Sequence, residues 1–258
     1  MRRDVDEIEA FWDEQAKTHG TSDLATAPDH YYRQLEMNCI AKRLKLGDRV
    51  LDVGCGNGYS TEFFSKLVSG TYTGMDYSEE MIRLAQSRGS AKLHFTHGNA
   101  VLFPKEIADN CFDTVISTRC LINLRNWDEQ QFALLEMKSV LPKGGRIILV
   151  ENFVDGLDNL NRLREDAGLD EIEQRWHNRY MRLDAFYPFI NQHFYIEERD
   201  NIGNLYYIIS RVVYAAEAKR RGEEISYDHP MNRLASRLPT LGAFDSYSPN
   251  FLFVLRVK

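Results

Sequence analysis

The sequence lacks the features that mark several common classes of protein. Its four cysteines form no Cys-x-x-Cys pair, and no cluster of acidic residues or spacing of Cys and His indicates a metal site. No apolar run approaches the roughly 20 residues that a membrane-spanning helix needs. The N-terminus turns acidic at once, so we expect no signal peptide. Reduced thiols and a cytoplasmic location are the matching expectations.

An excess of positive charge is also missing. The chain carries 32 Lys and Arg against 38 Asp and Glu, a formal net charge of −6 over 258 residues, and neither half is basic. Nucleic acids and anionic membranes are therefore not expected as partners. Hydrophobic residues at 43% and charged residues at 27% are typical of a globular protein, and the length suits either one domain or one domain with a large insertion. The oligomeric state stays open, with a homodimer as one option.

Short apolar segments alternate with helical patterns through the first half of the chain. This alternation predicts βαβ units and a mostly parallel sheet covered on both faces, an α/β fold. Seven strands are expected, at residues 49–53, 71–75, 93–97, 112–117, 146–150, 194–198 and 250–258.

The chain divides into three expected parts. They are an N-terminal helical cap at residues 1–45, a ligand-binding core at 46–153, and the rest of the sheet at 154–258. The last part carries two insertions, 155–192 and 203–248, which we expect to act as a lid over a substrate. No regular element is assigned to residues 183–193.

Aromatic residues concentrate between positions 176 and 207, outside the core. We expect this cluster to form the wall of an enclosed pocket, although packing between lid helices would explain part of it. Its nine members are Trp176, Tyr180, Phe186, Tyr187, Phe189, Phe194, Tyr195, Tyr206 and Tyr207.

A glycine-rich turn follows the first expected strand. Residues 50–58 read V-L-D-V-G-C-G-N-G and lead from that strand into a helix. Glycines permit positive φ and a close approach of a ligand, while the helix presents free N–H groups. The spacing G-x-G-x-G differs from both the G-x-G-x-x-G dinucleotide fingerprint and the P-loop, so NAD-dependent chemistry is disfavoured. Asp76 ends the second strand, where a carboxylate can accept hydrogen bonds from two ribose hydroxyls.

These segments together resemble the class I S-adenosylmethionine-dependent methyltransferases over about residues 30–153. The matching segments are Leu51–Gly58, Gly74–Met81, Gly98–Ala100, Phe112–Ser117 and Leu141–Arg146. The resemblance implies a Rossmann-like, doubly wound sheet and S-adenosylmethionine as the cofactor.

The resemblance also implies a set of cofactor contacts. Asp52 would orient the methionine amino group, Asp76 would hold the ribose diol, and Tyr31 or Tyr32 would lie over the mouth of the site. The other implied contacts are Gly54, Cys55, Gly56 and Ser117 for the methionine and ribose, and Tyr77, Met81, Asn99 and Ala100 for adenine. The family often has Asp where Asn99 stands, but the Asn amide oxygen can accept the same hydrogen bond.

The acceptor is expected to be a small molecule that is methylated at oxygen or nitrogen, with a sugar or a secondary metabolite as candidates. No Asn/Asp-Pro-Pro-aromatic motif, which base-methylating relatives carry, follows the fourth strand. His177 is the candidate general base, because an imidazole titrates in the useful range. Arg119 is a candidate clamp on a carboxylate or phosphate, or else a surface residue at a helix start. Tyr180 is the third candidate catalytic residue.

Two other functions stay open at this stage. The same cofactor could undergo cyclisation or aminocarboxypropyl transfer, which would release methylthioadenosine instead of S-adenosylhomocysteine. The chain could also bind the cofactor without catalysis. The sequence leaves the acceptor, the attacked atom and the use of a base undecided.

Overall fold

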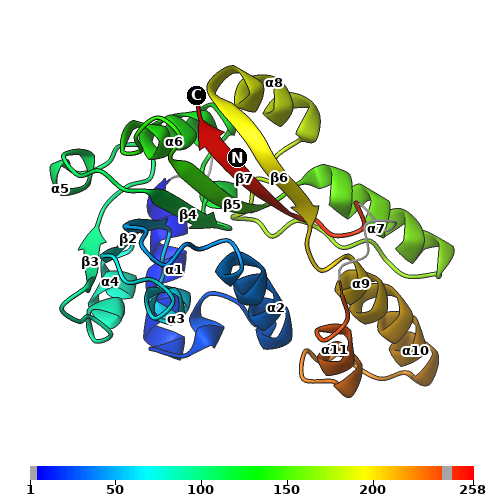
Figure 1. Ribbon diagram of the computed structural model, residues 1–258. Coiled ribbons are helices and arrows are strands. Elements are labelled where there is room, and N and C mark those ends of the chain that lie inside the picture. Colours follow the sequence, from blue (N-terminus) through cyan, green and yellow to red (C-terminus); the bar gives the residue numbers. More distant parts are fainter. Residues whose placement is uncertain (1–4, 240–245) are drawn as a thin grey trace.

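Seven strands form one sheet in the order β3-β2-β1-β4-β5-β7-β6 (Figure 1). The computed structural model describes residues 5–239 and 246–258. The strands are β1 (Val50–Val53), β2 (Tyr72–Asp76), β3 (Leu93–His97), β4 (Thr114–Thr118), β5 (Arg146–Asn152), β6 (Phe194–Asn201) and β7 (Asn250–Val257). Strands β1 to β5 are parallel, and β7 runs antiparallel to both neighbours. The expected Rossmann-like, mostly parallel seven-stranded sheet is confirmed.

Helices cover both faces of this sheet. The longer ones are α1 (Val5–His19), α2 (His30–Ala41), α6 (Trp127–Ser139), α7 (Val154–Asp166) and α8 (Leu183–His193). The shorter ones are α3 (Tyr59–Ser65), α4 (Glu79–Gln86), α5 (Lys105–Ala108), α9 (Asn204–Tyr207), α10 (Tyr214–Arg221) and α11 (Pro230–Ala235), with a π-helix at Ile208–Val213. In Figure 1, α6 and α8 lie on one face and α2 and α3 on the other.

Alternating side chains of the strands build two hydrophobic cores. Ile147 and Leu149 of β5 join the core under α6 and α8, while Ile148 and Val150 join the core under α2 and α3. Successive side chains of a strand point to opposite faces, so a strand covered on both sides is apolar throughout. This burial explains why the central strands appear in the sequence as short continuous apolar runs.

The strand order reverses between β1 and β4. The loops after these two strands turn to opposite faces, which opens a crevice at their carboxyl ends. Both insertions begin or end near this edge. The first contains α7 and α8, and the second contains α9 to α11, which lie together beyond the end of β6 at the lower right of Figure 1. Residues 240–245 of the second insertion lie outside the described residues.

Helix α8 is an element that the sequence pattern did not predict. Phe186 and Ile190 lie one turn apart on α8, and both are fully buried against the sheet. Phe186 packs edge-on against Phe153, with ring centroids 5.1 Å apart, and lies 4.8 Å from the ring of Phe253. Much of the aromatic cluster is therefore part of the main core.

Candidate active site

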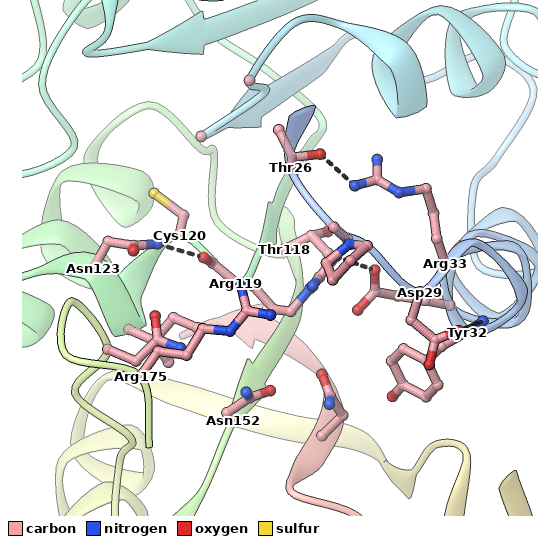
Figure 2. Close-up of a pocket in the computed structure, with 18 of the residues that line it drawn as sticks. Thr26, Asp29, Tyr32, Arg33, Thr118, Arg119, Cys120, Asn123, Asn152 and Arg175 are labelled. Carbon is pink, nitrogen blue, oxygen red and sulfur yellow. Dashed lines mark hydrogen bonds and ion pairs between the residues drawn. The ribbon is translucent and has the colours of Figure 1, made fainter. Parts of the chain in front are cut away.

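A cavity of about 280 Å³ lies beyond the carboxyl ends of β1, β2 and β4 (Figure 2). Its walls come from the N-terminal helices, the sheet loops and both insertions. We call one group of lining residues the turn side: Asp52, Gly54, Cys55, Gly56, Asp76, Tyr77 and Met81. We call another group the arginine side: Arg119, Asn152, Arg175, Tyr180, Tyr207, Arg211 and Asn250.

The glycine-rich turn has a backbone that only glycine accommodates well. Gly54 and Gly56 have φ of +78° and +55°, in the left-handed region. A Cβ on Gly54 would lie 2.5 Å from the Cβ of Cys120, and one on Gly56 would lie 2.7 Å from Thr26. Both the conformation and the close packing of neighbouring loops therefore require glycine here.

Asp76 presents an oriented carboxylate to the cavity. It is 8% exposed, and its Oδ2 accepts a hydrogen bond from the Gly56 N–H at 2.8 Å. Its Oδ1 accepts from the Ser78 N–H at 3.0 Å. Burial raises the pKa of Asp76, while these N–H donors lower it. Because a carboxylate offers about four lone-pair sites, two can still accept hydrogen bonds from a diol.

Asp52 is buried more completely beneath the same turn. Its Oδ2 accepts a hydrogen bond from the Thr61 hydroxyl at 2.8 Å. Burial raises the pKa of Asp52 from 3.8 to about 7. The neighbouring Cys55 thiol is also buried, which raises its pKa and leaves it unreactive as a nucleophile.

The remaining residues expected at the cofactor differ in position. Tyr77, Met81 and Tyr32 line the cavity, whereas Asn99, Ala100, Ser117 and Tyr31 are not among its lining residues. Ser117 is fully buried, and its hydroxyl lies 3.3 Å from Oε1 of Glu151. The cofactor roles of these seven residues stay predictions.

Arg119 directly follows β4 and is held in an unusual conformation. Its φ is +52°, in a region that residues other than glycine rarely adopt. Its guanidinium Nη2 lies 3.1 Å from Glu36 Oε2, and the carboxylate is almost fully buried. Burial lowers the pKa of Arg119, but Glu36 and two tyrosines raise it overall. Arg119 therefore lies in the cavity wall and not on a surface helix.

Three further arginines line the cavity. Figure 2 shows Arg33 and Arg175 approaching it from different elements. Arg33 donates to the Thr26 hydroxyl, and burial together with the charge of Arg119 lowers its pKa to about 10. Arg211 forms an ion pair with Asp29, the residue that caps α2.

Asp29 joins the N-terminal part of the chain to the second insertion. Its Oδ1 accepts from the Tyr32 N–H at 3.0 Å and from the Tyr206 hydroxyl at 2.7 Å, in addition to the Arg211 pair. These contacts bridge residues that are far apart in sequence. Asp29 and Arg211 both line the cavity, so these contacts form part of its wall.

His177 and Tyr180 also line the cavity, so all three candidate catalytic residues meet there. His177 is 2% exposed, and its ring stacks on Trp12 with centroids 5.5 Å apart at 20°. Phe11 packs edge-on against the same ring. Burial raises the pKa of the Tyr180 hydroxyl, so it stays protonated at neutral pH. Their catalytic roles stay predictions.

The prediction that the cluster at 176–207 forms the pocket wall is wrong for seven of its nine residues. Only Tyr180 and Tyr207 line the cavity. Phe186 and Phe194 are fully buried in the core, and Tyr195 is 60% exposed. The aromatic lining comes instead from across the chain: Trp12, Tyr32, Tyr59, Phe64, Tyr77, Tyr180, Tyr207 and Tyr227. Helix α8 takes up much of the cluster because its apolar face packs on the sheet.

Sequence reasoning missed several polar residues of the arginine side. Asn152 ends β5 and Asn250 begins β7, and the two are paired across the strands. Both line the cavity. A polar amide at the end of an otherwise apolar strand was the signal available in the sequence. Glu36 gave no such signal, because the sequence of α2 alone does not indicate that this carboxylate is buried.

Within residues 5–239 and 246–258, no group of three or more His, Cys, Asp or Glu side chains is arranged to hold a metal ion. Within the same ranges, no helix has the length and apolar character needed to cross a membrane.

Residues 50–145 match the family model described as a methyltransferase domain. A demethylmenaquinone methyltransferase of Staphylococcus haemolyticus is 38% identical over 112 residues, which cover 42% of this chain and 45% of the relative. The chain thus spans about half the length of the curated relatives it matches.

Solved structures match over nearly the whole chain. A chain of the complex between the Haloferax volcanii Trm112 methyltransferase activator and a methyltransferase has a TM-score of 0.61 at 19% identity, and 97% of each chain is covered. The magnesium protoporphyrin IX methyltransferase of Synechocystis PCC 6803 has a TM-score of 0.59 at 14% identity, with 96% of this chain and 94% of that chain covered. At these identities the likeness shows a shared fold.

Proposed function

We propose that this protein is a class I S-adenosylmethionine-dependent methyltransferase that uses S-adenosylmethionine as its cofactor and methylates a small molecule, because residues 50–145 match a methyltransferase domain. The observation that carries this proposal is one cavity with two differently built sides. Its turn side has the glycine turn and Asp76, and its arginine side is assembled largely from the two insertions. A sugar or a secondary metabolite, methylated at oxygen or nitrogen, is the acceptor we propose.

The turn side has the chemistry that the cofactor needs. Asp76 would accept hydrogen bonds from the ribose hydroxyls, because the Gly56 and Ser78 N–H groups already hold its carboxylate in place. Tyr77 and Met81 would pack against adenine. When bound, the cofactor supplies an electrophilic methyl group on a sulfonium centre.

The arginine side would hold the acceptor and exclude water. We propose that His177 accepts the proton that leaves the attacking oxygen or nitrogen, because it lines the cavity and its ring is held by Trp12 and Phe11. Tyr180, kept protonated, and Arg119 would orient the acceptor. Such positioning in an enclosed site is the main contribution an enzyme makes to an in-line displacement.

The relatives support the type of reaction more than the acceptor. These relatives are named as demethylmenaquinone methyltransferases, and they match less than half of this chain. The acceptor must therefore be argued from the residues of this cavity.

Analysis of the reaction product, together with cofactor binding, tests the proposed function. Incubation with S-adenosylmethionine and a panel of hydroxylated and amine acceptors should release S-adenosylhomocysteine, detected by chromatography. Release of methylthioadenosine alone would replace methyl transfer with cyclisation or aminocarboxypropyl transfer. Cofactor binding with no product from any acceptor would favour a binding module.

The cofactor assignment has its own test. Asp76→Asn should weaken S-adenosylmethionine binding by about 1–3 kcal/mol in calorimetry, because a charged acceptor of hydrogen bonds becomes neutral. Asp170→Asn is the control, since that carboxylate is 99% exposed. Equal affinity of Asp76→Asn and the control would remove Asp76 from the ribose site. His177→Ala should slow turnover and leave this affinity unchanged, and wild-type turnover would remove His177 as the base.

A further inference from the structure

Buried polar atoms without a hydrogen-bond partner gather around the cavity. Among the described residues they include guanidinium nitrogens of Arg119 and Arg211 and amide oxygens of Asn152 and Asn250. All four residues belong to the arginine side. Folded proteins pair nearly all buried polar groups, so such a concentration in one cavity needs an explanation. A polar ligand that supplies the missing partners is one.

The two amides form a paired acceptor site. Asn152 and Asn250 lie opposite each other in the β5–β7 register, so their side chains are neighbours on one face of the sheet. Asn250 Nδ2 donates to the Tyr207 hydroxyl at 3.1 Å, which orients that amide and leaves Oδ1 available. Two neighbouring carbonyl oxygens are matched by a ligand that has neighbouring hydroxyl donors.

The two guanidinium groups form a donor site. Arg119 uses Nη2 for Glu36, and Arg211 uses Nη2 for Asp29, while Arg119 Nε and Arg211 Nη1 make no hydrogen bond. Their ion pairs hold both guanidinium groups in place, so the remaining N–H groups are pre-oriented. Guanidinium N–H groups bind carboxylate and phosphate oxygens more strongly than neutral acceptors.

We infer that the acceptor of the proposed methyl transfer is a hydroxylated small molecule that also carries an oxyanion group, a carboxylate or a phosphate. Its anionic oxygens bind Arg119 and Arg211, and its hydroxyl groups donate to Asn152 and Asn250. This inference rests on the proposed function, because it assigns the acceptor of that reaction. An apolar acceptor would leave these groups buried and unpaired, and each such group lowers affinity about tenfold.

Fragments that vary one property at a time test this inference. D-glucuronate and D-glucose 6-phosphate are the hydroxylated anions, and methyl glucoside is the hydroxylated neutral molecule. Cyclohexanecarboxylate is an anion without hydroxyl groups. Cyclohexanone has neither a charge nor a hydroxyl group. Binding is measured by calorimetry on the protein saturated with S-adenosylhomocysteine. At least one hydroxylated anion should bind at least tenfold more tightly than methyl glucoside, cyclohexanecarboxylate and cyclohexanone. The two hydroxylated anions distinguish a carboxylate from a phosphate.

Substitutions on the arginine side test whether its residues cause the preference for hydroxylated anions. Arg119→Lys keeps a charge opposite Glu36 but loses the Nε donor, so the preference for the anion should fall about tenfold. Asn152→Leu should reduce the preference for hydroxyl groups and leave the preference for the anion. Arg179→Gln is the matched control, because Arg179 lies in the same segment as Arg175 but is not among the lining residues. The melting temperature of each variant without probes checks that it folds.

The outcomes separate this inference from the proposed function. Tightest binding of cyclohexanone, equal binding of all probes, or no binding of any probe to the S-adenosylhomocysteine complex overturns the inference. An unchanged preference in both Arg119→Lys and Asn152→Leu also overturns it. Failure to bind S-adenosylhomocysteine at all overturns the proposed function instead.

Discussion

The two carboxylates of the turn side differ from Arg119 and Asn152 of the arginine side in how their polar atoms are satisfied, although the Tyr77 hydroxyl of the turn side also has no partner. On the turn side, the Asp76 carboxylate accepts two backbone N–H bonds and Asp52 accepts the Thr61 hydroxyl. On the arginine side, Arg119 and Asn152 each keep a buried polar atom without a partner. A satisfied network is rigid before any ligand binds, whereas an unsatisfied one is completed by its ligand. The turn side is thus prepared for one constant ligand, and the arginine side determines which acceptor enters.

The two sides also differ in how the chain assembles them. The turn side comes from two consecutive strand–turn–helix units. The arginine side combines the loop after β4, the facing ends of β5 and β7, the segment around residues 175–180 and the second insertion. Local sequence controls the first side, while long-range packing controls the second.

The largest expected effect separates the core from the arginine side. Phe186→Ala removes a fully buried ring that contacts Phe153 and Phe253, so the free energy of unfolding should fall by about 3–5 kcal/mol. Cofactor affinity of the folded protein should stay unchanged. Urea unfolding and calorimetry measure the two quantities. Tyr195→Ala, on the exposed surface, is the control and should change stability by less than about 0.5 kcal/mol.

If Phe186→Ala instead reduced ligand binding with little loss of stability, the aromatic cluster would belong to the cavity after all.

A smaller effect should come from the turn side. Gly54→Ala adds a Cβ that meets Cys120 at 2.5 Å in a residue with φ of +78°, so we expect a loss of about 2–4 kcal/mol and weaker cofactor binding. Gly144→Ala is the matched control, because Gly144 has φ of +81° but open space around it. It should cost about 1 kcal/mol. Equal losses in thermal unfolding would show that close packing against Cys120 contributes nothing.

Stability should also depend on pH through a carboxylate beneath the arginine side. Glu151 accepts hydrogen bonds from the N–H groups of Cys120 and Leu121 at 2.9 Å, and burial raises its pKa from 4.5 to about 7. The folded state then binds more protons than the unfolded state between these pH values. The stability that the Glu151 carboxyl contributes is therefore fully present below pH 4.5. It is lost as the pH rises through 7.

Glu151→Gln removes this titration and keeps one oxygen to accept an N–H bond. Between pH 5 and pH 8, the stability of the unmodified protein relative to this variant should fall by about 1–3 kcal/mol. Denaturant unfolding at several pH values measures the difference. A difference that does not change with pH would mean that Glu151 is ionised throughout.

The smallest expected effect concerns one hydroxyl on the arginine side. Tyr207→Phe leaves the Asn250 Nδ2 group without its acceptor, so stability should fall by about 0.5–1.5 kcal/mol. The KM for the acceptor should rise, because the amide loses its orientation, while cofactor affinity stays constant. Tyr195→Phe is the control, since that side chain is largely exposed. A rise in the cofactor Kd alone would place Tyr207 on the turn side.

Local sequence was enough to predict the turn side and the main sheet. Glycines at 54, 56 and 58 all adopt positive φ, and Asp76 ends β2 as expected. Asp29 and Ser78 cap the helices that follow them. The parallel direction of most strands follows from the alternation of strands and helices, because parallel strands need crossover connections. Each of these features depends on residues that are neighbours in the chain.

Only the tertiary structure decided the arginine side and the place of the aromatic cluster. The burial of Arg119 depends on Glu36 from α2, and the Asn152–Asn250 pair depends on the register of β5 with β7. Phe186 belongs to the core because α8 packs on the sheet. The sequence by itself determined which segments form strands, turns and caps, since those choices are local. Which side chains meet in the cavity was decided by packing between distant segments, because burial and pairing arise only when the sheet and insertions come together.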